Sequence, residues 1–109
     1  MRIYLIGYMG CGKSTLGKKL AQKLEMQFID MDCFIEERNY KSIAQIFEGY
    51  GEETFRKKEQ KALKELSEFT NVVIATGGGA PVFFDNIEVM NQTGITIFID
   101  VTTEELVKR

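Results

Sequence analysis

The residues whose types and spacing most directly predict chemistry form a glycine-rich run near the start of the chain. The run reads Gly7-Tyr8-Met9-Gly10-Cys11-Gly12-Lys13-Ser14, which matches the phosphate-loop pattern G-x-x-x-x-G-K-S/T at every defined position. Its glycines allow a tight turn whose backbone N–H groups can approach phosphate oxygens, and the helix that follows adds its positive dipole end. The lysine can reach the β and γ phosphates, while the serine hydroxyl can ligate Mg²⁺. The sequence therefore predicts a nucleoside triphosphate site, contacted by Gly10, Cys11, Gly12, Lys13, Ser14 and Thr15.

Two carboxylates, Asp30 and Asp32, follow at the end of a second predicted strand, residues 27–30. Ligands bind at the carboxyl ends of parallel strands in α/β sheets, and strand alternation would point both side chains the same way. Such a pair suits a metal ion and the orientation of an acceptor hydroxyl. We predict that Asp30 assists the metal held by Ser14, because it lies one strand after the phosphate loop, although Asp100 also ends a predicted strand. The alternative is that both acids are solvated and cap the next helix.

Arg56 and the glycine run at residues 77–79 are candidates for binding an acceptor. Arg56 follows the apolar Phe55 on a predicted long helix, and a guanidinium at the edge of an apolar face suits the bidentate capture of a carboxylate. Glycines directly after a buried strand let the backbone approach a ligand closely. The simpler alternatives are a surface arginine paired with Glu52 or Glu59, and a flexible glycine turn.

The elements that must position these residues alternate between strands and helices along the chain. Short apolar runs predict strands at residues 3–6, 27–30, 72–75 and 95–99. Amphipathic or capped segments predict a helix beginning near residue 13, helices at residues 34–39, 52–69 and 85–93, a short helix opened by Ser42 that stops near residues 49–51, and a last helix from about residue 103. This alternation predicts one α/β domain, residues 1–109, with a parallel sheet between two layers of helices. The strand at residues 95–99 would be left at an edge of the sheet.

Composition narrows the class of protein. The chain has 109 residues, 44% of them hydrophobic and 28% charged, with a net charge of −2, as in ordinary globular domains. A slightly acidic chain without a basic patch is not expected to bind nucleic acid, and no apolar stretch is long enough to cross a membrane. Cys11 and Cys33 predict reduced thiols rather than a disulfide. We expect a cytoplasmic protein that acts as a monomer on a small molecule.

Taken together, these motifs resemble those of shikimate kinase over the whole chain. The matching segments keep the order and spacing of that family: the phosphate loop through Thr15, then Asp30-Met31-Asp32, Ser42-Ile43-Ala44-Gln45-Ile46-Phe47, Gly51-Glu52 with Phe55-Arg56 and Glu59, and Ala75-Thr76-Gly77-Gly78-Gly79. Each segment except the phosphate loop is a weak signal alone, whereas the set is specific.

The resemblance implies a fold like that of the nucleoside monophosphate kinases. It also implies transfer of the γ-phosphoryl group of ATP to the 3-hydroxyl of shikimate, a step of chorismate and aromatic amino-acid biosynthesis. In that reaction Lys13 would hold phosphates, Ser14 would bind Mg²⁺, and Asp30 would assist the metal through water. Asp32 would hydrogen-bond the attacking hydroxyl, as a base or as an orienting group. Arg56 would bind the shikimate carboxylate, together with the backbone of Gly77, Gly78 and Gly79.

Members of this family continue beyond the point where this chain ends, into a mobile lid with arginines, a further strand and terminal helices. The lid supplies positive charge to the transferring phosphoryl group. We therefore expect an N-terminal portion with little activity alone, because losing such an arginine lowers the rate by about 10³-fold or more. Two other functions stay open: another small-molecule kinase with the same loop, such as one acting on gluconate or a nucleoside monophosphate, and a nucleotide-binding module without catalysis.

Overall fold

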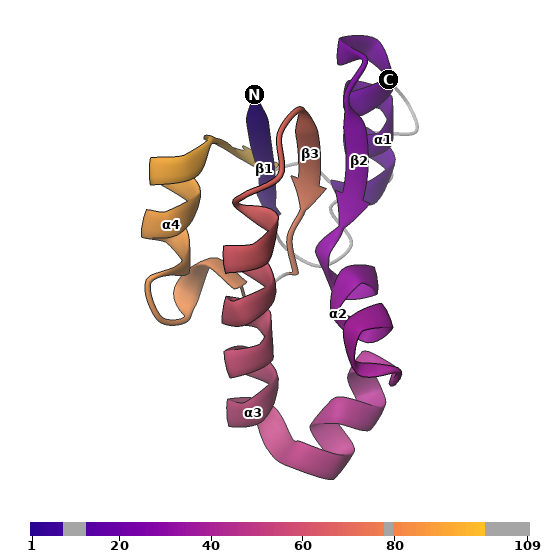
Figure 1. Cartoon of the computed structure of the whole chain (residues 1–109), viewed down its shortest axis with the longest axis vertical. Coiled ribbons are helices and arrows are strands. Elements are labelled where there is room, and N and C mark those ends of the chain that lie inside the picture. Colours follow the sequence, from indigo (N-terminus) through magenta and orange to yellow (C-terminus); the bar gives the residue numbers. More distant parts are fainter. Residues whose placement is uncertain (8–12, 78–79, 100–109) are drawn as a thin grey trace.

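The computed structural model describes residues 1–7, 13–77 and 80–99, which form a parallel sheet with helices on both faces (Figure 1). Its elements are β1 Arg2–Gly7, α1 Lys13–Leu24, β2 Gln27–Asp30, α2 Met31–Asn39, α3 Ile43–Leu66, β3 Val72–Ala75, the 3₁₀ turn η1 Ala80–Val82, α4 Asn86–Thr93 and β4 Ile95–Ile99. The four strands are all parallel and run in the order β2-β3-β1-β4. The predicted α/β class is confirmed, while the helix expected from residue 103 lies outside the described residues.

Strand alternation divides the core into two layers. Ile3, Leu5 and Val73 face one way and pack with Ala21 of α1. Tyr4, Val72 and Ile74 face the other way and pack against apolar side chains of α2, α3 and α4, among them Ile35, Leu63, Leu66 and Met90. Every residue of β3 is buried, which explains why its sequence is an unbroken apolar run rather than an alternating one.

The helix that follows the phosphate loop, α1, packs closely on the sheet, and this contact fixes its position. Gly17 is buried in α1. A Cβ atom added there would lie 2.5 Å from Cε1 of Phe28 on β2, closer than real atoms approach. Only glycine therefore lets α1 lie this near to β2, which carries Asp30 at its end.

Two helix boundaries differ from the sequence predictions. The helix expected at residues 34–39 begins earlier, at Met31, because Asp30 acts as its N-cap and accepts a hydrogen bond from the Cys33 backbone N–H at 3.2 Å. Asp32 therefore lies in the first turn of α2 and not on the strand, so the argument from strand alternation was wrong. The long helix ends at Leu66 rather than at residue 69.

The predicted break between a short and a long helix is confirmed inside α3. The capping box of Ser42 and Gln45 opens the helix, with both reciprocal hydrogen bonds present. Gly51 then interrupts it with φ 85° and ψ 171°, a backbone conformation that glycine adopts more readily than other residues. The break turns the segment before Gly51 back toward α2 at the bottom of Figure 1.

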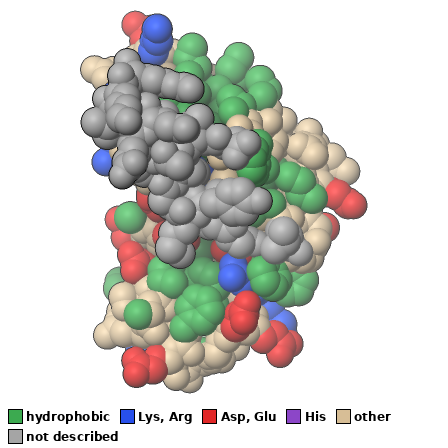
Figure 2. All heavy atoms as spheres, turned by 180° about the vertical axis from the view of Figure 1, so that it is seen from behind, with side chains coloured by type: hydrophobic (Ala, Val, Ile, Leu, Met, Phe, Trp, Pro, Cys, Tyr) green, Lys and Arg blue, Asp and Glu red, His purple; other side chains and the backbone are tan. Residues whose placement is uncertain are grey.

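The last described strand lies at an edge of the sheet, as expected. Large apolar side chains of β4 stay exposed, with Ile95 at 51%, Ile97 at 37% and Phe98 at 53%. Hydrophobic side chains are visible on the surface of the upper half of the molecule when it is seen from behind (Figure 2). Among the described residues, no helix is both long enough and apolar enough to span a bilayer.

Candidate functional site

The phosphate-loop motif has the expected strand and helix on its two sides. β1 ends at Gly7, α1 begins at Lys13, and the Lys13 Nζ donates a hydrogen bond to the Gly7 carbonyl at 2.8 Å. Thr15 is exposed in the first turn of α1. Gly10, Cys11 and Gly12 lie outside the described residues, so their contacts with a nucleotide stay a prediction. The helix directs its N-terminal end, with its partial positive charge, to the place where phosphates are expected.

Ser14 and Asp30 lie together, although they come from different elements. The Ser14 Oγ donates a hydrogen bond to Oδ2 of Asp30 at 2.9 Å. Hydroxyl and carboxylate oxygens are the hard ligands that Mg²⁺ prefers, and Mg²⁺ bound with a nucleotide usually takes only one or two protein ligands beside water and phosphate oxygens. The two residues therefore fit the predicted magnesium site. The alternative acid, Asp100, lies outside the described residues.

A second group of side chains gathers where α2, α3 and the end of β3 meet. A Cβ atom added to Gly77 would lie 2.9 Å from Oδ1 of Asp32 and 3.2 Å from Oε2 of Glu59. The glycine backbone therefore lies beside two carboxylates, with no room for a larger residue unless they move. The preceding Thr76 holds this end of the strand, since its Oγ1 donates to the Leu5 carbonyl at 2.9 Å. Gly78 and Gly79 lie outside the described residues.

Arg56 completes this group and pairs with two acids of its own helix, Glu59 and Glu52. Its Nη1 donates to both oxygens of Glu59, at 3.2 and 3.3 Å. Its Nε is buried and makes no hydrogen bond within the described part of the chain, but it forms an ion pair at 3.6 Å with Oε1 of Glu52, whose side chain is 61% exposed. In a planar guanidinium, Nε and Nη2 form the edge that binds a carboxylate with two parallel hydrogen bonds. Arg56 thus has a buried structural partner in Glu59 and, at Nε, a donor that makes no hydrogen bond among the described residues.

Both acids of this group bind protons more tightly than usual. Burial raises the pKa of Asp32, the charges of Asp30 and Glu36 raise it further, and Lys13 and Arg56 oppose the rise. Burial also raises the pKa of Glu59, against the hydrogen bond and charge of Arg56. Carboxylates with raised pKa values in a shared site are typical of positions that exchange protons with a substrate.

Glu59 was named in the sequence as part of the family motif and as a possible partner of a surface arginine, without a role in the site, yet it is 1% exposed. A signal was present in the sequence, because Glu59 interrupts the apolar stripe that Phe55, Ala62 and Leu63 form on the long helix. An acid among such neighbours is seldom buried without a partner. The centre of the Phe55 ring lies 5.2 Å from the Arg56 Cζ, and this ring packs on Phe47, with the centres of the two rings 4.6 Å apart.

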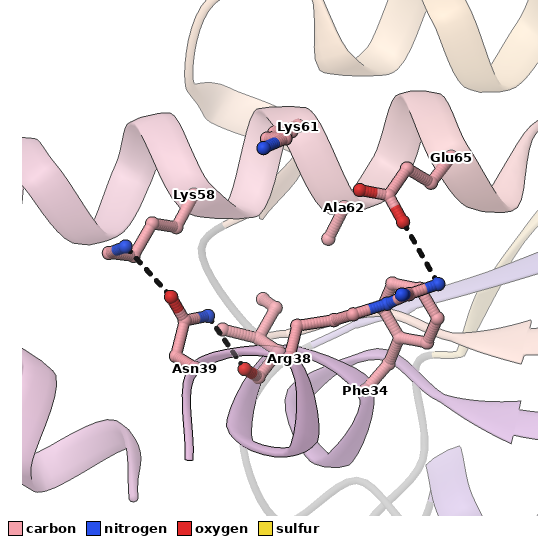
Figure 3. Close-up of a pocket in the computed structure, with 8 residues that line it drawn as sticks. Phe34, Arg38, Asn39, Lys58, Lys61, Ala62 and Glu65 are labelled. Atoms are coloured by element: carbon pink, nitrogen blue, oxygen red, sulfur yellow. Dashed lines mark hydrogen bonds and ion pairs between the residues drawn. The ribbon is translucent and has the colours of Figure 1, made fainter. Parts of the chain in front are cut away.

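A separate cavity of about 230 Å³ lies between α2 and α3 (Figure 3), lined by Phe34, Ile35, Arg38, Asn39, Lys58, Lys61, Ala62 and Glu65. Two polar links join the helices across it. Arg38 Nη2 pairs with Oε2 of Glu65 at 3.2 Å, and Lys58 Nζ donates to Oδ1 of Asn39 at 2.8 Å. These links help to hold the helix that carries Asp32 beside the helix that carries Arg56.

Comparison with known proteins gives a consistent result. Residues 9–109 match the family described as "SKI: Shikimate kinase". The chain is 53% identical over 108 residues to a shikimate kinase from Parabacteroides distasonis, which covers 99% of this chain and 62% of that protein. Among solved structures, the shikimate kinase from Bacteroides thetaiotaomicron matches 100% of this chain and 62% of its own, with a TM-score of 0.92 and 53% identity.

A third comparison involves a bound ligand. The structure described as shikimate kinase from Acinetobacter baumannii in complex with shikimate matches 99% of this chain and 60% of its own, with a TM-score of 0.90 and 41% identity. The chain thus spans about three fifths of the length of the relatives it matches. The family match and the likeness in sequence and fold lead to one conclusion: the chain belongs to the shikimate kinase family.

Proposed function

We propose that the protein to which this chain belongs is a shikimate kinase that transfers the γ-phosphoryl group of ATP to the 3-hydroxyl of shikimate. One observation carries the proposal. Asp32 lies beside Gly77 and next to Glu59, the partner of Arg56 at the acceptor end, and its charge also interacts with Lys13 at the phosphate end. A carboxylate in that position can hold an acceptor hydroxyl while the two cations bind the phosphates and the acceptor's carboxylate. The shikimate bound to the Acinetobacter relative supports the choice of acceptor.

Each of the candidate site residues then has a role in positioning the reactants. Lys13 would hold the β and γ phosphates, and Ser14 would hold Mg²⁺ with the assistance of Asp30. The ion supplies positive charge to the phosphate oxygens. Arg56 binds the shikimate carboxylate along its Nε–Nη2 edge, beside the backbone of Gly77. As the bond from the acceptor oxygen to the γ-phosphorus forms and the bond to ADP breaks, Asp32 receives the hydroxyl proton and later releases it to water.

The Arg56 edge also provides a test of substrate choice. Shikimate is titrated into the protein by calorimetry, with and without Mg·ADP, for this chain and for a chain of the full length of its relatives. Arg56→Lys keeps a positive charge beside Glu59 but loses the two parallel donors, so shikimate should bind at least tenfold more weakly. Arg38→Lys makes the same change outside the site and should leave binding unchanged.

Three results would contradict the proposal. A folded full-length protein that binds Mg·ADP but not shikimate would exclude this acceptor and favour another small-molecule kinase or a nucleotide-binding module. Equal binding by the Arg56→Lys variant would remove Arg56 from the acceptor site. Phosphorylation of gluconate or of a nucleoside monophosphate in preference to shikimate would change the substrate class. A cytoplasmic location and a monomeric state are further expectations of this proposal.

A further inference from the structure

We infer that Phe83 is a positioning residue for Arg56, held in place by the buried side chain of Asn86, and that it sets the selectivity of the acceptor site for a carboxylate. The inference rests on the proposed function only in naming shikimate as the ligand. Neither residue was among the site residues predicted from the sequence. Phe83 follows η1 and Asn86 begins α4, so both come after the glycine run that follows β3.

The ring of Phe83 contacts the guanidinium of Arg56 more closely than any other ring does in the described part of the chain. The Arg56 Cζ lies 4.1 Å from the centre of the Phe83 ring, against 5.2 Å from that of Phe55. A guanidinium is attracted to the face of an aromatic ring. Because Glu59 already holds Nη1, the ring fixes the plane of the group, and a ligand carboxylate that lies in this plane can replace the exposed Glu52 along the Nε–Nη2 edge.

Asn86 explains why Phe83 stays in this position. Its side chain is fully buried, and Nδ2 donates to the Ala80 carbonyl at 2.9 Å. Backbone hydrogen bonds join the same segment, from Ala80 N–H to the Gly77 carbonyl at 3.1 Å and from Asn86 N–H to the Phe83 carbonyl at 3.2 Å. Gly77 at the site, the turn that follows it and Phe83 are therefore connected through Asn86.

The surroundings of Oδ1, the second polar side-chain atom of Asn86, indicate that Asn86 does more than stabilise the fold. Its Oδ1 is buried and has no hydrogen-bond partner among the described residues. A buried acceptor without a partner is unfavourable for folding, and an apolar side chain of similar size would avoid it. What Asn86 supplies is a donor that fixes the turn. The same connection also reaches α3, since Gln60 Nε2 donates to Oδ1 of Asp85 at 3.1 Å.

An arginine held in this way is preorganised for its ligand. Without the ring, the guanidinium could turn its Nε toward Glu52, which already lies 3.6 Å away and would compete with the ligand carboxylate. Loss of an aromatic contact with a partly desolvated cation corresponds to roughly a 5- to 30-fold change in an equilibrium constant. The change should appear in acceptor binding and not in nucleotide binding, because the cation that Phe83 contacts is Arg56, at the acceptor end.

The experiment compares three variants in the full-length protein. Phe83→Leu removes the aromatic face but keeps an apolar side chain, Phe83→Tyr keeps the face, and Phe84→Leu is the matched control. Phe84 is the adjacent phenylalanine, 55% exposed, with a positive φ of 53° that is unfavourable for leucine and phenylalanine alike. Two readouts are recorded: the NMR resonance of the Arg56 Nε–Hε group without ligand, and the Kd values for shikimate, for its carboxamide analogue and for Mg·ADP.

We expect Phe83→Leu to shift the Arg56 resonance, to weaken shikimate binding roughly 5- to 30-fold, and to reduce the preference for shikimate over the carboxamide, while the Kd for Mg·ADP stays within twofold. Phe83→Tyr should keep the wild-type Arg56 resonance, shikimate affinity and preference for shikimate, and Phe84→Leu should change none of them. Asn86→Ala should act in the same direction as Phe83→Leu.

Several outcomes would overturn the inference. They are an unshifted Arg56 resonance in Phe83→Leu, unchanged shikimate binding, an equal loss of Mg·ADP binding, and a failure of Phe83→Tyr to restore the wild-type values. A wild-type protein that binds no shikimate contradicts the proposed function instead. In that case the Arg56 resonance alone decides whether Phe83 positions the arginine. If Phe83→Leu fails to fold, wild-type-like values in Phe83→Tyr support the role of the ring, and altered values there reject it.

Discussion

Two arginine–glutamate pairs, one between α2 and α3 and one within α3, have the same N–O distance but differ in burial. Arg38 pairs with Glu65 across the cavity of Figure 3, and Arg56 pairs with Glu59 within α3, both at 3.2 Å. The side chains of the first pair are 59% and 37% exposed, whereas those of the second are 17% and 1% exposed. An exposed pair adds about 0–1 kcal/mol to stability, but removing one partner of a buried pair costs about 3–5 kcal/mol.

The difference shows that the fold is less stable at the buried pair, where the candidate site lies. Burial raises the pKa of Glu59, whereas the side chain of Glu65 is 37% exposed. Charges in the buried group repel one another and lack water, so the group persists because the rest of the fold holds it. The exposed pair, Arg38 and Glu65, can be changed with little loss of stability. It is therefore the natural control for the buried pair, Arg56 and Glu59.

Removal of the buried cation should have the largest effect. Arg56→Ala leaves Glu59 buried beside Asp32 with no counter-charge, and we expect a loss of about 3 kcal/mol in the free energy of unfolding at pH 7, measured by urea denaturation. The loss should shrink as the pH falls, because Glu59 then becomes neutral. Arg38→Ala is the matched variant. Equal losses in the two variants would mean that burial does not distinguish the pairs.

A methyl group placed between the buried acids should have the next largest effect. Gly77→Ala pushes a Cβ against Asp32 and Glu59, and we expect a loss of about 1–3 kcal/mol together with weaker shikimate binding. Gly49→Ala in α3 has nothing within 4 Å of the new atom and should instead stabilise the helix by about 0.5–1 kcal/mol. A neutral result at Gly77 would show that both carboxylates move freely out of the way.

Neutralising Asp32 should stabilise the fold and remove part of its pH dependence. Its folded pKa is raised above the ordinary 3.8, so the folded state holds this proton more tightly than the unfolded state. The contribution of Asp32 to stability therefore falls as the pH rises from 3.8 through the raised pKa, and the full penalty is present at neutral pH.

We expect Asp32→Asn to add about 1 kcal/mol at pH 7 and to converge with the wild type near pH 4, while the proposed kinase activity is lost. Thermal unfolding from pH 4 to pH 8 measures the effect. The exposed Glu37→Gln provides a control on the same helix, with no expected gain. A stability difference for Asp32→Asn that is the same at both pH limits would show that its carboxylate carries no penalty.

The exposed pair should give the smallest effect. Glu65→Gln should lower the free energy of unfolding by less than about 1 kcal/mol, and the loss should disappear in 1 M NaCl because salt screens exposed charges. A double-mutant cycle with Arg38→Gln isolates the coupling between the two side chains. A coupling above about 2 kcal/mol that resists salt would place this pair in the same class as the buried one.

The sequence predicted most of the fold because local signals agree with the global structure. The phosphate loop, the capping box at Ser42 and the unbroken apolar run of β3 each indicate one element and no other. Asp32 was assigned to the right region for the wrong reason, since the capping role of Asp30 moved the start of α2 back by three residues. Local capping was stronger there than strand alternation.

The parts of the site that the sequence did not predict depend on contacts between distant segments. Phe83 is an ordinary apolar residue in the sequence, and only the path of the chain from β3 to α4 brings it over Arg56. The burial of Glu59 likewise depends on the approach of Gly77, which comes from another layer of the fold. The predicted roles of Lys13, Ser14, Asp30 and Asp32 remain predictions until ligands are measured.

The order of the strands has a consequence for synthesis of the protein. β1 is made first, yet it pairs only with β3 and β4, and β3 begins at Val72. At 5–20 residues per second, the central strand waits roughly 3–13 s on the ribosome before its first neighbour exists. During that time β2, α1, α2 and α3 have all been made, but neither β1 nor β2 has its partner strand β3. The nascent chain therefore keeps two strands unpaired during this interval, which is where a chaperone would have the greatest effect on the yield of folded protein.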